Sequence, residues 1–144
     1  YDQVCSGRTG HAEVVQITYD PAAVTFREIL EMFFVIHDPT TLNRQGNDTG
    51  TQYRSAIFYH SPEQKKTAGE VIAAFTQKRA YDNPIVTEVV PAGPFYVAED
   101  YHQDYLTRNP TQRYIVINDL PKIQNLKQVF PAVYRGQPVL VKGN

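Results

Sequence analysis

The opening stretch YDQVCSGRTGHAEVV gathers several reactive side-chain types within a few residues. It contains the chain's only cysteine, Cys5, together with Tyr1, His11 and Glu13. A thiol can act as a nucleophile or a redox group, but a free cysteine is more often a small buried hydrophobic residue. The loop around Cys5 offers no evident activating base. The residue types therefore favour a structural Cys5.

Glu13 is the stronger candidate for chemistry. Alternation over residues 11–19 predicts a strand that carries Glu13, Val15 and Ile17 on one face. A carboxyl group buried on an apolar face has a raised pKa and suits a general acid. A solvated glutamate at the edge of a sheet fits the same pattern, and the residues alone leave both readings open.

The remaining polar residues give weaker signals. Asp48, in GNDTG, has a turn position as its default, and Tyr53 could pack in the core or donate its hydroxyl. The four histidines, among them His102, are scattered singly, so no metal site is predicted. The nucleophile-elbow pattern G-x-S-x-G and the phosphate-loop pattern are both absent.

Composition limits the class of protein. The chain has 144 residues and a formal net charge of −1, which fits one domain and argues against a nucleic-acid binder. No apolar run is long enough to span a membrane. A single cysteine cannot form an internal disulfide, and this favours a reducing, cytoplasmic setting.

Helix and strand signals alternate along the chain. Thr25 and Glu28 form a capping box before a helix that runs to about residue 37, and Ser61 with Pro62 begins another helix. Further predicted elements are strands at 53–59, 85–90 and 114–117, a short helix from residue 98 and a helix at 120–130. This order predicts the α+β class, as a two-layer sandwich with helices on a mixed, mainly antiparallel sheet. We expect one domain over residues 1–144, with a loose tail at 135–144.

Three stretches resemble the A type of peptide methionine sulfoxide reductase. They are YDQVCSGRTGHAEVV, HDPTTLNRQGNDTGTQYRSAI and AEDYHQDY. The resemblance continues to about Arg135 and implies a ferredoxin-like α+β core. It also implies an oxidoreductase that repairs proteins under oxidative stress by reducing the S-epimer of methionine sulfoxide, free or in proteins. In that family a cysteine attacks the sulfoxide and becomes a sulfenic acid, and thioredoxin or another thiol restores it without a bound cofactor.

The resemblance also assigns roles to residues of this chain. Glu13 would protonate the sulfoxide oxygen, and Tyr1 and Tyr53 would hydrogen-bond that oxygen. Asp48 would help to organise the site. His102, in AEDYHQDY, would belong to the substrate-binding set.

One family motif is missing. G-C-F-W-G, which carries the attacking cysteine, does not occur in these 144 residues, and Cys5 matches a family position that is not the nucleophile. We therefore expect an N-terminally incomplete domain whose nucleophile lies upstream of Tyr1, and a chain that is inactive alone. Its expected partners are oxidised proteins or free methionine sulfoxide, thioredoxin and its own N-terminal segment, with no nucleic acid or membrane. The alternative is a remnant that binds methionine sulfoxide or methionine without turnover.

Overall fold

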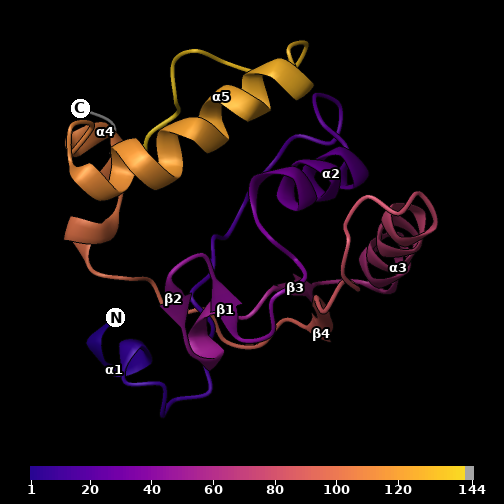
Figure 1. The fold of residues 1–144 in the computed structure, drawn as a ribbon, viewed down its shortest axis with the longest axis horizontal. Helices are drawn as coiled ribbons and strands as arrows, with labels where there is room; N and C mark the ends of the chain where they lie inside the picture. The colour runs from indigo at the N-terminus through magenta and orange to yellow at the C-terminus, as the bar shows by residue number, and fades with distance from the viewer. Residues whose placement is uncertain (142–144) are drawn as a thin grey trace. The chain divides into compact units, whose positions relative to one another are not determined.

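The computed structural model describes residues 1–141, which divide into two units, Tyr1–Phe95 and the segment from Tyr96 onward. The first unit carries the two longest helices and all the strands of the described residues (Figure 1). Within residues 1–141, no helix is both long enough and apolar enough to cross a membrane.

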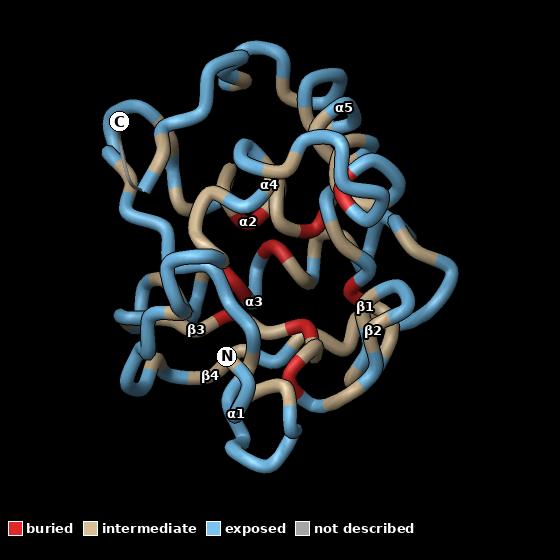
Figure 2. Tube along the Cα trace, turned by 90° about the vertical axis from the view of Figure 1, so that its left-hand side faces the viewer, coloured by how far each residue is buried: buried red, intermediate tan, exposed pale blue. Residues whose placement is uncertain are grey.

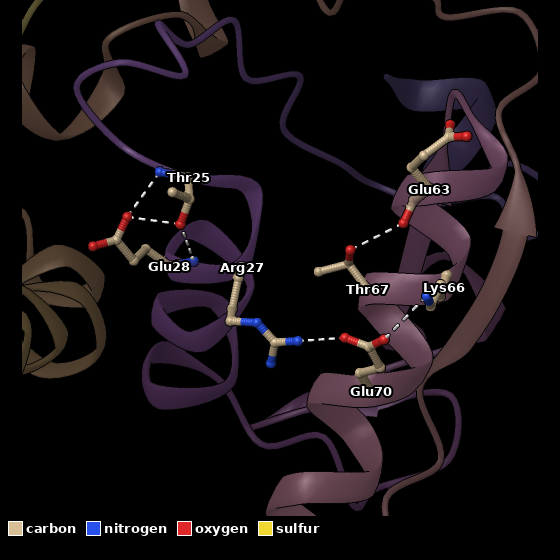
Figure 3. Close-up of polar contacts among 7 residues, drawn as sticks. All are labelled: Thr25, Arg27, Glu28, Glu63, Lys66, Thr67 and Glu70. Carbon is tan, nitrogen blue, oxygen red and sulfur yellow. Dashed lines mark hydrogen bonds and ion pairs between the residues drawn. The ribbon is translucent and has the colours of Figure 1, made fainter.

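Helices α2 (Phe26–Ile36) and α3 (Pro62–Gln77) begin where the sequence predicts. At the start of α2, the Thr25 hydroxyl accepts from the Glu28 amide at 3.2 Å and the Glu28 carboxylate accepts from the Thr25 amide at 2.8 Å (Figure 3). The Ser61 hydroxyl caps α3 by accepting from the Gln64 amide at 3.2 Å. These side chains satisfy backbone N–H groups that have no partner inside the helix, so both predicted starts are confirmed.

The core of the first unit lies where α2 and α3 pack against strand β3 (Ala56–Tyr59). Buried residues come from all three elements, and Figure 2 colours buried stretches of the chain red. The core residues are Leu30, Phe34, Ile57, Ala68 and Val71. Ile72 and Phe75, on the predicted apolar stripe of α3, are partly buried against this cluster. An exposed ion pair between Arg27 and Glu70 also joins the two helices (Figure 3). Exposed pairs contribute little, so apolar burial holds the helices together.

The strands form two separate ladders. Strand β3 pairs in parallel with β4 (Glu88–Pro91), and α3 forms part of the crossover that a parallel pair requires. Strands β1 (Arg44–Gln45) and β2 (Asp48–Thr49) form an antiparallel hairpin within the predicted polar loop. The α+β class is confirmed, but the described residues show two small ladders, the longer one parallel, in place of one mainly antiparallel sheet.

The predicted strand at residues 11–19 is wrong. These residues have no regular secondary structure, and Val15 and Ile17 are 84% and 57% exposed. A strand needs a partner for its backbone groups, and no ladder within residues 1–141 includes this segment. A segment with an alternating sequence forms a strand only where it has a neighbouring strand to pair with and a layer that covers its apolar face.

The second unit is helical. It contains η2 (Asp100–His102), α4 (Tyr105–Arg108), the π-helical turn η3 (Ile115–Asp119) and α5 (Leu120–Val129). The helix predicted from residue 98 is divided at Asp104, which has a left-handed φ of 54°. The strand predicted at 114–117 is wrong: this short apolar run enters η3, and the Val116 amide donates to the Gln112 carbonyl at 3.0 Å. Periodicity cannot separate helix from strand in so short a run.

Helix α5 confirms the helix predicted at 120–130 and ends at Val129. Ile123 and Leu126 on this helix and Phe130 directly after it are half-buried. In the predicted tail, residues 135–141 have no helix or strand, and the Val141 amide donates to the Asp104 carboxylate at 3.0 Å. The rest of that predicted tail, 142–144, lies outside the described residues. The single-domain organisation stays a prediction.

Candidate active site

A single helical turn places Tyr1 beside Cys5. In α1 (Asp2–Cys5) the Cys5 amide donates to the Tyr1 carbonyl at 2.9 Å. Residues four apart lie on one face of a helix, so the phenol and the thiol are neighbours. A hydrogen bond to Cys5 is the largest cause of a strongly raised pKa of the Tyr1 phenol, followed by burial and by the negative charge of Glu13.

Glu13 reaches the same place through its backbone. Its amide donates to the carbonyl of Gln52 at 2.8 Å, which ties the segment after Gly10 to the turn η1 (Thr51–Tyr53). The side chain of Glu13 is exposed. Of the two alternatives that the residues leave open, burial of the carboxyl group on an apolar strand face is wrong, because the strand that would bury it does not form, and Glu13 is solvated.

The hairpin β1–β2 and the turn η1 position the other two predicted residues. Gly46 turns the hairpin with a left-handed φ of 58°, and Asp48 follows on β2, half-buried. The Tyr53 amide donates to the Gly50 carbonyl at 3.0 Å, which closes η1. The pKa of the Tyr53 phenol is raised, first by burial and then by the negative charges of Cys5, Glu13 and Asp48.

The structure thus gathers five predicted residues in one cluster. Tyr1, Cys5, Glu13, Asp48 and Tyr53 all lie in the first unit, and their charges or hydrogen bonds act on the two phenols. At neutral pH both phenols are protonated and able to donate hydrogen bonds. His102 lies in the second unit, on η2, with its ring 4.2 Å from that of Tyr101.

Sequence reasoning missed two residues beside Tyr53. Gln52 is 6% exposed, and its side-chain amide donates to the Cys5 carbonyl at 3.2 Å. Arg54 donates to the Gly10 carbonyl at 3.2 Å. The sequence gives one signal for these roles: two long polar residues flank a candidate phenol. The prediction of a strand that starts at Tyr53 drew attention away from this signal.

A partly buried chain of polar side chains holds the end of this region against α2. His37 Nε2 lies 2.8 Å from the Ser55 hydroxyl, which lies 2.7 Å from the Thr87 hydroxyl. Ser55 is only 6% exposed, so these bonds form away from water and fix the start of β3. The position of Tyr53 is therefore anchored to the core.

The site offers no metal-ligand set. Within residues 1–141, no group of three or more His, Cys, Asp and Glu side chains could hold a metal ion. The chemistry of the cluster is that of two carboxyl groups, two phenols and a thiol. Such groups can donate protons and hydrogen bonds to a polar oxygen on a ligand.

A family model for peptide methionine sulfoxide reductase matches residues 1–133. The chain belongs to this family. Peptide methionine sulfoxide reductase MsrA 2 of Mesorhizobium japonicum is 55% identical over 98% of the chain and 73% of its own length. The enzyme named peptide methionine sulfoxide reductase MsrA of Sulfolobus acidocaldarius is 53% identical over 91% of the chain and 73% of its own length.

Two solved structures extend the family match to the fold. Mxr1 of Saccharomyces cerevisiae in reduced form is 47% identical, with a TM-score of 0.73 over 77% of this chain. Methionine sulfoxide reductase A of Corynebacterium diphtheriae is 46% identical, with a TM-score of 0.71 over 76%. The chain spans 60% and 57% of the lengths of these two structures. The activity and partners of the longer reductases therefore come to this chain only as proposals.

Proposed function

We propose that this chain supplies the proton-donor part of a methionine sulfoxide reductase site, specific for the S-epimer of free or protein-bound methionine sulfoxide. The observation that carries the proposal is the shared electrostatic effect of Glu13 on two phenols. Its negative charge is one of the causes that raise the pKa of both Tyr1 and Tyr53, so the carboxyl group lies near both phenols. An acid flanked by two phenol donors suits a sulfoxide oxygen.

The chemistry needs that arrangement because the sulfoxide oxygen is a poor leaving group unless it accepts a proton as the S–O bond breaks. An attacking thiolate bonds to the sulfoxide sulfur, Glu13 gives its proton to the oxygen, and the phenols stabilise the developing charge. The resulting hydroxyl group moves from the methionine sulfur to the attacking sulfur as the bond between the two sulfurs breaks, so the products are methionine and a sulfenic acid on the attacking thiol. A second thiol then condenses with the sulfenic acid, releasing water and forming a disulfide, which the dithiol of thioredoxin reduces.

The exposure of Glu13 shapes the proposal. An apolar side chain laid over a carboxyl group removes its water, and desolvation raises the pKa of such a group. Binding of the substrate side chain would therefore favour the protonated form of Glu13, which is the form that can donate a proton. Asp48, which acts on Tyr53, is proposed to orient the phenol, and His102 is proposed to contact the substrate.

The attacking thiol is proposed to lie outside these residues. No G-C-F-W-G motif occurs in the 144 residues, and Cys5 engages both phenols as a neighbour within the cluster. We propose that this chain alone binds the sulfoxide without turnover, in a reducing compartment such as the cytoplasm. The second candidate is a protein that only binds methionine sulfoxide or methionine.

The first test uses this chain with dithiothreitol and the separate S- and R-epimers of methionine sulfoxide. We expect the S-epimer to bind more tightly and no sustained reduction to occur. Reduction that is lost in Cys5→Ser would show that Cys5 is the nucleophile and would contradict the assignment. Equal binding of both epimers would contradict the proposed specificity.

The second test separates a reductase from a binding remnant. In a form of the protein that carries the motif, Glu13→Gln should slow reduction by about 100-fold or more, as expected for loss of a general acid. Glu63→Gln, an exposed glutamate of α3, is the matched control and should leave the rate unchanged. Equal rates for the wild type and Glu13→Gln would remove the acid role.

A further inference from the structure

Two polar side chains that flank Tyr53 both reach back to the first segment of the chain. Gln52 contacts the Cys5 carbonyl and Arg54 contacts the Gly10 carbonyl, at 3.2 Å each. Both acceptors lie between Tyr1 and Glu13. The two residues therefore bridge the parts of the site that come from different stretches of the sequence.

Gln52 makes two bonds to that segment. Its side-chain amide donates to Cys5, and its backbone carbonyl accepts from the Glu13 amide at 2.8 Å. One residue thus sets the spacing between the turn that carries Cys5 and the backbone of Glu13. Reversing the amide would place oxygen against the Cys5 carbonyl oxygen, so the donor group must face this way.

The surroundings of Gln52 are shaped for its side chain. A Cβ atom at Gly50 would lie 2.3 Å from Gln52 Oε1, and one at Gly7 would lie 3.5 Å from it. Gln52 Oε1 is buried and has no hydrogen-bond partner within the described residues. Burying an unsatisfied acceptor is unfavourable, so packing alone would favour an apolar residue here. A positioning role explains why a glutamine stands there.

Arg54 is held in place by two contacts of its own. Its Nη1 donates to the Thr51 carbonyl at 2.8 Å, and its Nε lies 3.3 Å from the Glu88 carboxylate on β4. The side chain is only 17% exposed. The planar guanidinium is therefore preorganised by η1 and β4 before it meets Gly10, which a flexible lysine ammonium would not reproduce.

We propose that Gln52 and Arg54 are positioning residues that hold Tyr1 and Glu13 against Tyr53. The catalytic value of this positioning rests on the proposed function. The positioning itself rests only on the contacts between these residues. It can be measured without substrate and without an attacking thiol.

The experiment follows each phenol by pH titration in ¹³C-tyrosine-labelled protein, with single Tyr→Phe variants for assignment. Tyr81 is an internal reference because its phenol pKa is raised by burial and by Asp38, outside the cluster. In Gln52→Leu and Arg54→Met, the titrations of Tyr1 and Tyr53 should move toward the ordinary tyrosine value while Tyr81 keeps its own. Gln103→Leu removes a similar amide-to-carbonyl bond in the second unit and should move none of the three.

Unchanged titrations of Tyr1 and Tyr53 in both variants would overturn the proposal. If a variant also releases Tyr81, the fold has been disturbed, and Arg54→Lys then decides. This substitution keeps the positive charge and the alkyl chain but removes the planar guanidinium group. A shifted Tyr1 titration with an unchanged Tyr81 titration would support the positioning role, and an unchanged Tyr1 titration would contradict it.

Binding of the S-epimer of methionine sulfoxide gives a separate readout. Gln52→Leu and Arg54→Met should each bind this epimer about fivefold more weakly than the wild type, the effect of losing one hydrogen bond to the first segment. If the wild-type chain does not bind the sulfoxide, the proposed function fails while the titration result still stands.

Discussion

Substitution of Gly50 by alanine tests how closely the backbone approaches Gln52. Gly50 has φ 147° and ψ 160°, a combination that essentially only glycine adopts. Its added Cβ would lie 2.3 Å from Gln52 Oε1 and 2.8 Å from Cδ, well inside contact distance. The end of the Gln52 side chain would have to move, and its bond to Cys5 would break.

The expected loss of stability combines two parts. Strain at residue 50 adds about 1 to 3 kcal/mol, and the broken hydrogen bond adds about 1 kcal/mol. Gly50→Ala should therefore lower the free energy of unfolding of the first unit by about 2 to 4 kcal/mol. Gly46→Ala is the matched control in the same hairpin: its φ is 58°, and within residues 1–141 no atom outside its two chain neighbours lies within 4 Å of the added Cβ. Left-handed strain alone predicts about 1 to 2 kcal/mol there.

Urea unfolding followed by tyrosine fluorescence measures both variants, since the chain has ten tyrosines and no tryptophan. A double-mutant cycle isolates the clash. In a Gln52→Ala background, Gly50→Ala should lose only the strain, so the coupling should be about 1 kcal/mol. A loss for Gly50→Ala no larger than for Gly46→Ala, with no coupling to residue 52, would refute the reasoning.

Three further predictions concern the first unit. Phe34→Ala should destabilise it by about 3 to 5 kcal/mol in urea unfolding, because Phe34 is 1% exposed, whereas Leu42→Ala, at a 70% exposed side chain, should change it by about 0.5 kcal/mol or less. Thr25→Ala should remove about 1 kcal/mol by deleting the cap of α2, with a loss of helical signal in circular dichroism. Raised phenol pKa values mean that unfolding releases protons at high pH, so the urea midpoint should fall above pH ~10, and less steeply in Tyr81→Phe.

The parts of the fold that the sequence predicts well are those fixed by local interactions. The capping residues Thr25 and Ser61 sit next to the backbone groups they satisfy, so their effect needs no distant partner. The apolar spacing of α2 and α3 then matches the core that forms between them. Local rules are sufficient here because each helix supplies its own backbone bonds.

Strands are predicted less well because their bonds come from elsewhere. The segment at 11–19 and the run at 114–117 both have strand-like composition, yet neither has a partner strand within residues 1–141. The hairpin β1–β2 was hidden in a polar loop, since two-residue strands carry no periodic signal. The alternation of apolar and polar residues shows which side chains a strand could bury. Whether the strand forms depends on the presence of a partner strand.

The candidate site shows the same division. The identities of Glu13, Tyr53 and Asp48 could be predicted, because their side-chain types fit the chemistry and the resemblance. Their convergence could not be derived from spacing, since 40 positions separate Glu13 from Tyr53 in the chain. The bonds of Gln52 and Arg54 that join these stretches run from side chain to backbone, and such bonds leave no pattern in the acceptor's sequence.

Because Glu13 is exposed, its protonated form depends on what covers the side chain. A buried carboxyl group would be poised before substrate arrives, whereas an exposed one depends on what covers it. The two phenols do not share this dependence, because their protonation is already secured by burial, by Cys5 and by Glu13 itself. The structure therefore keeps both phenols protonated and leaves the Glu13 carboxyl group exposed to water. Under the proposed function, desolvation by the substrate would be the step that couples binding to proton transfer.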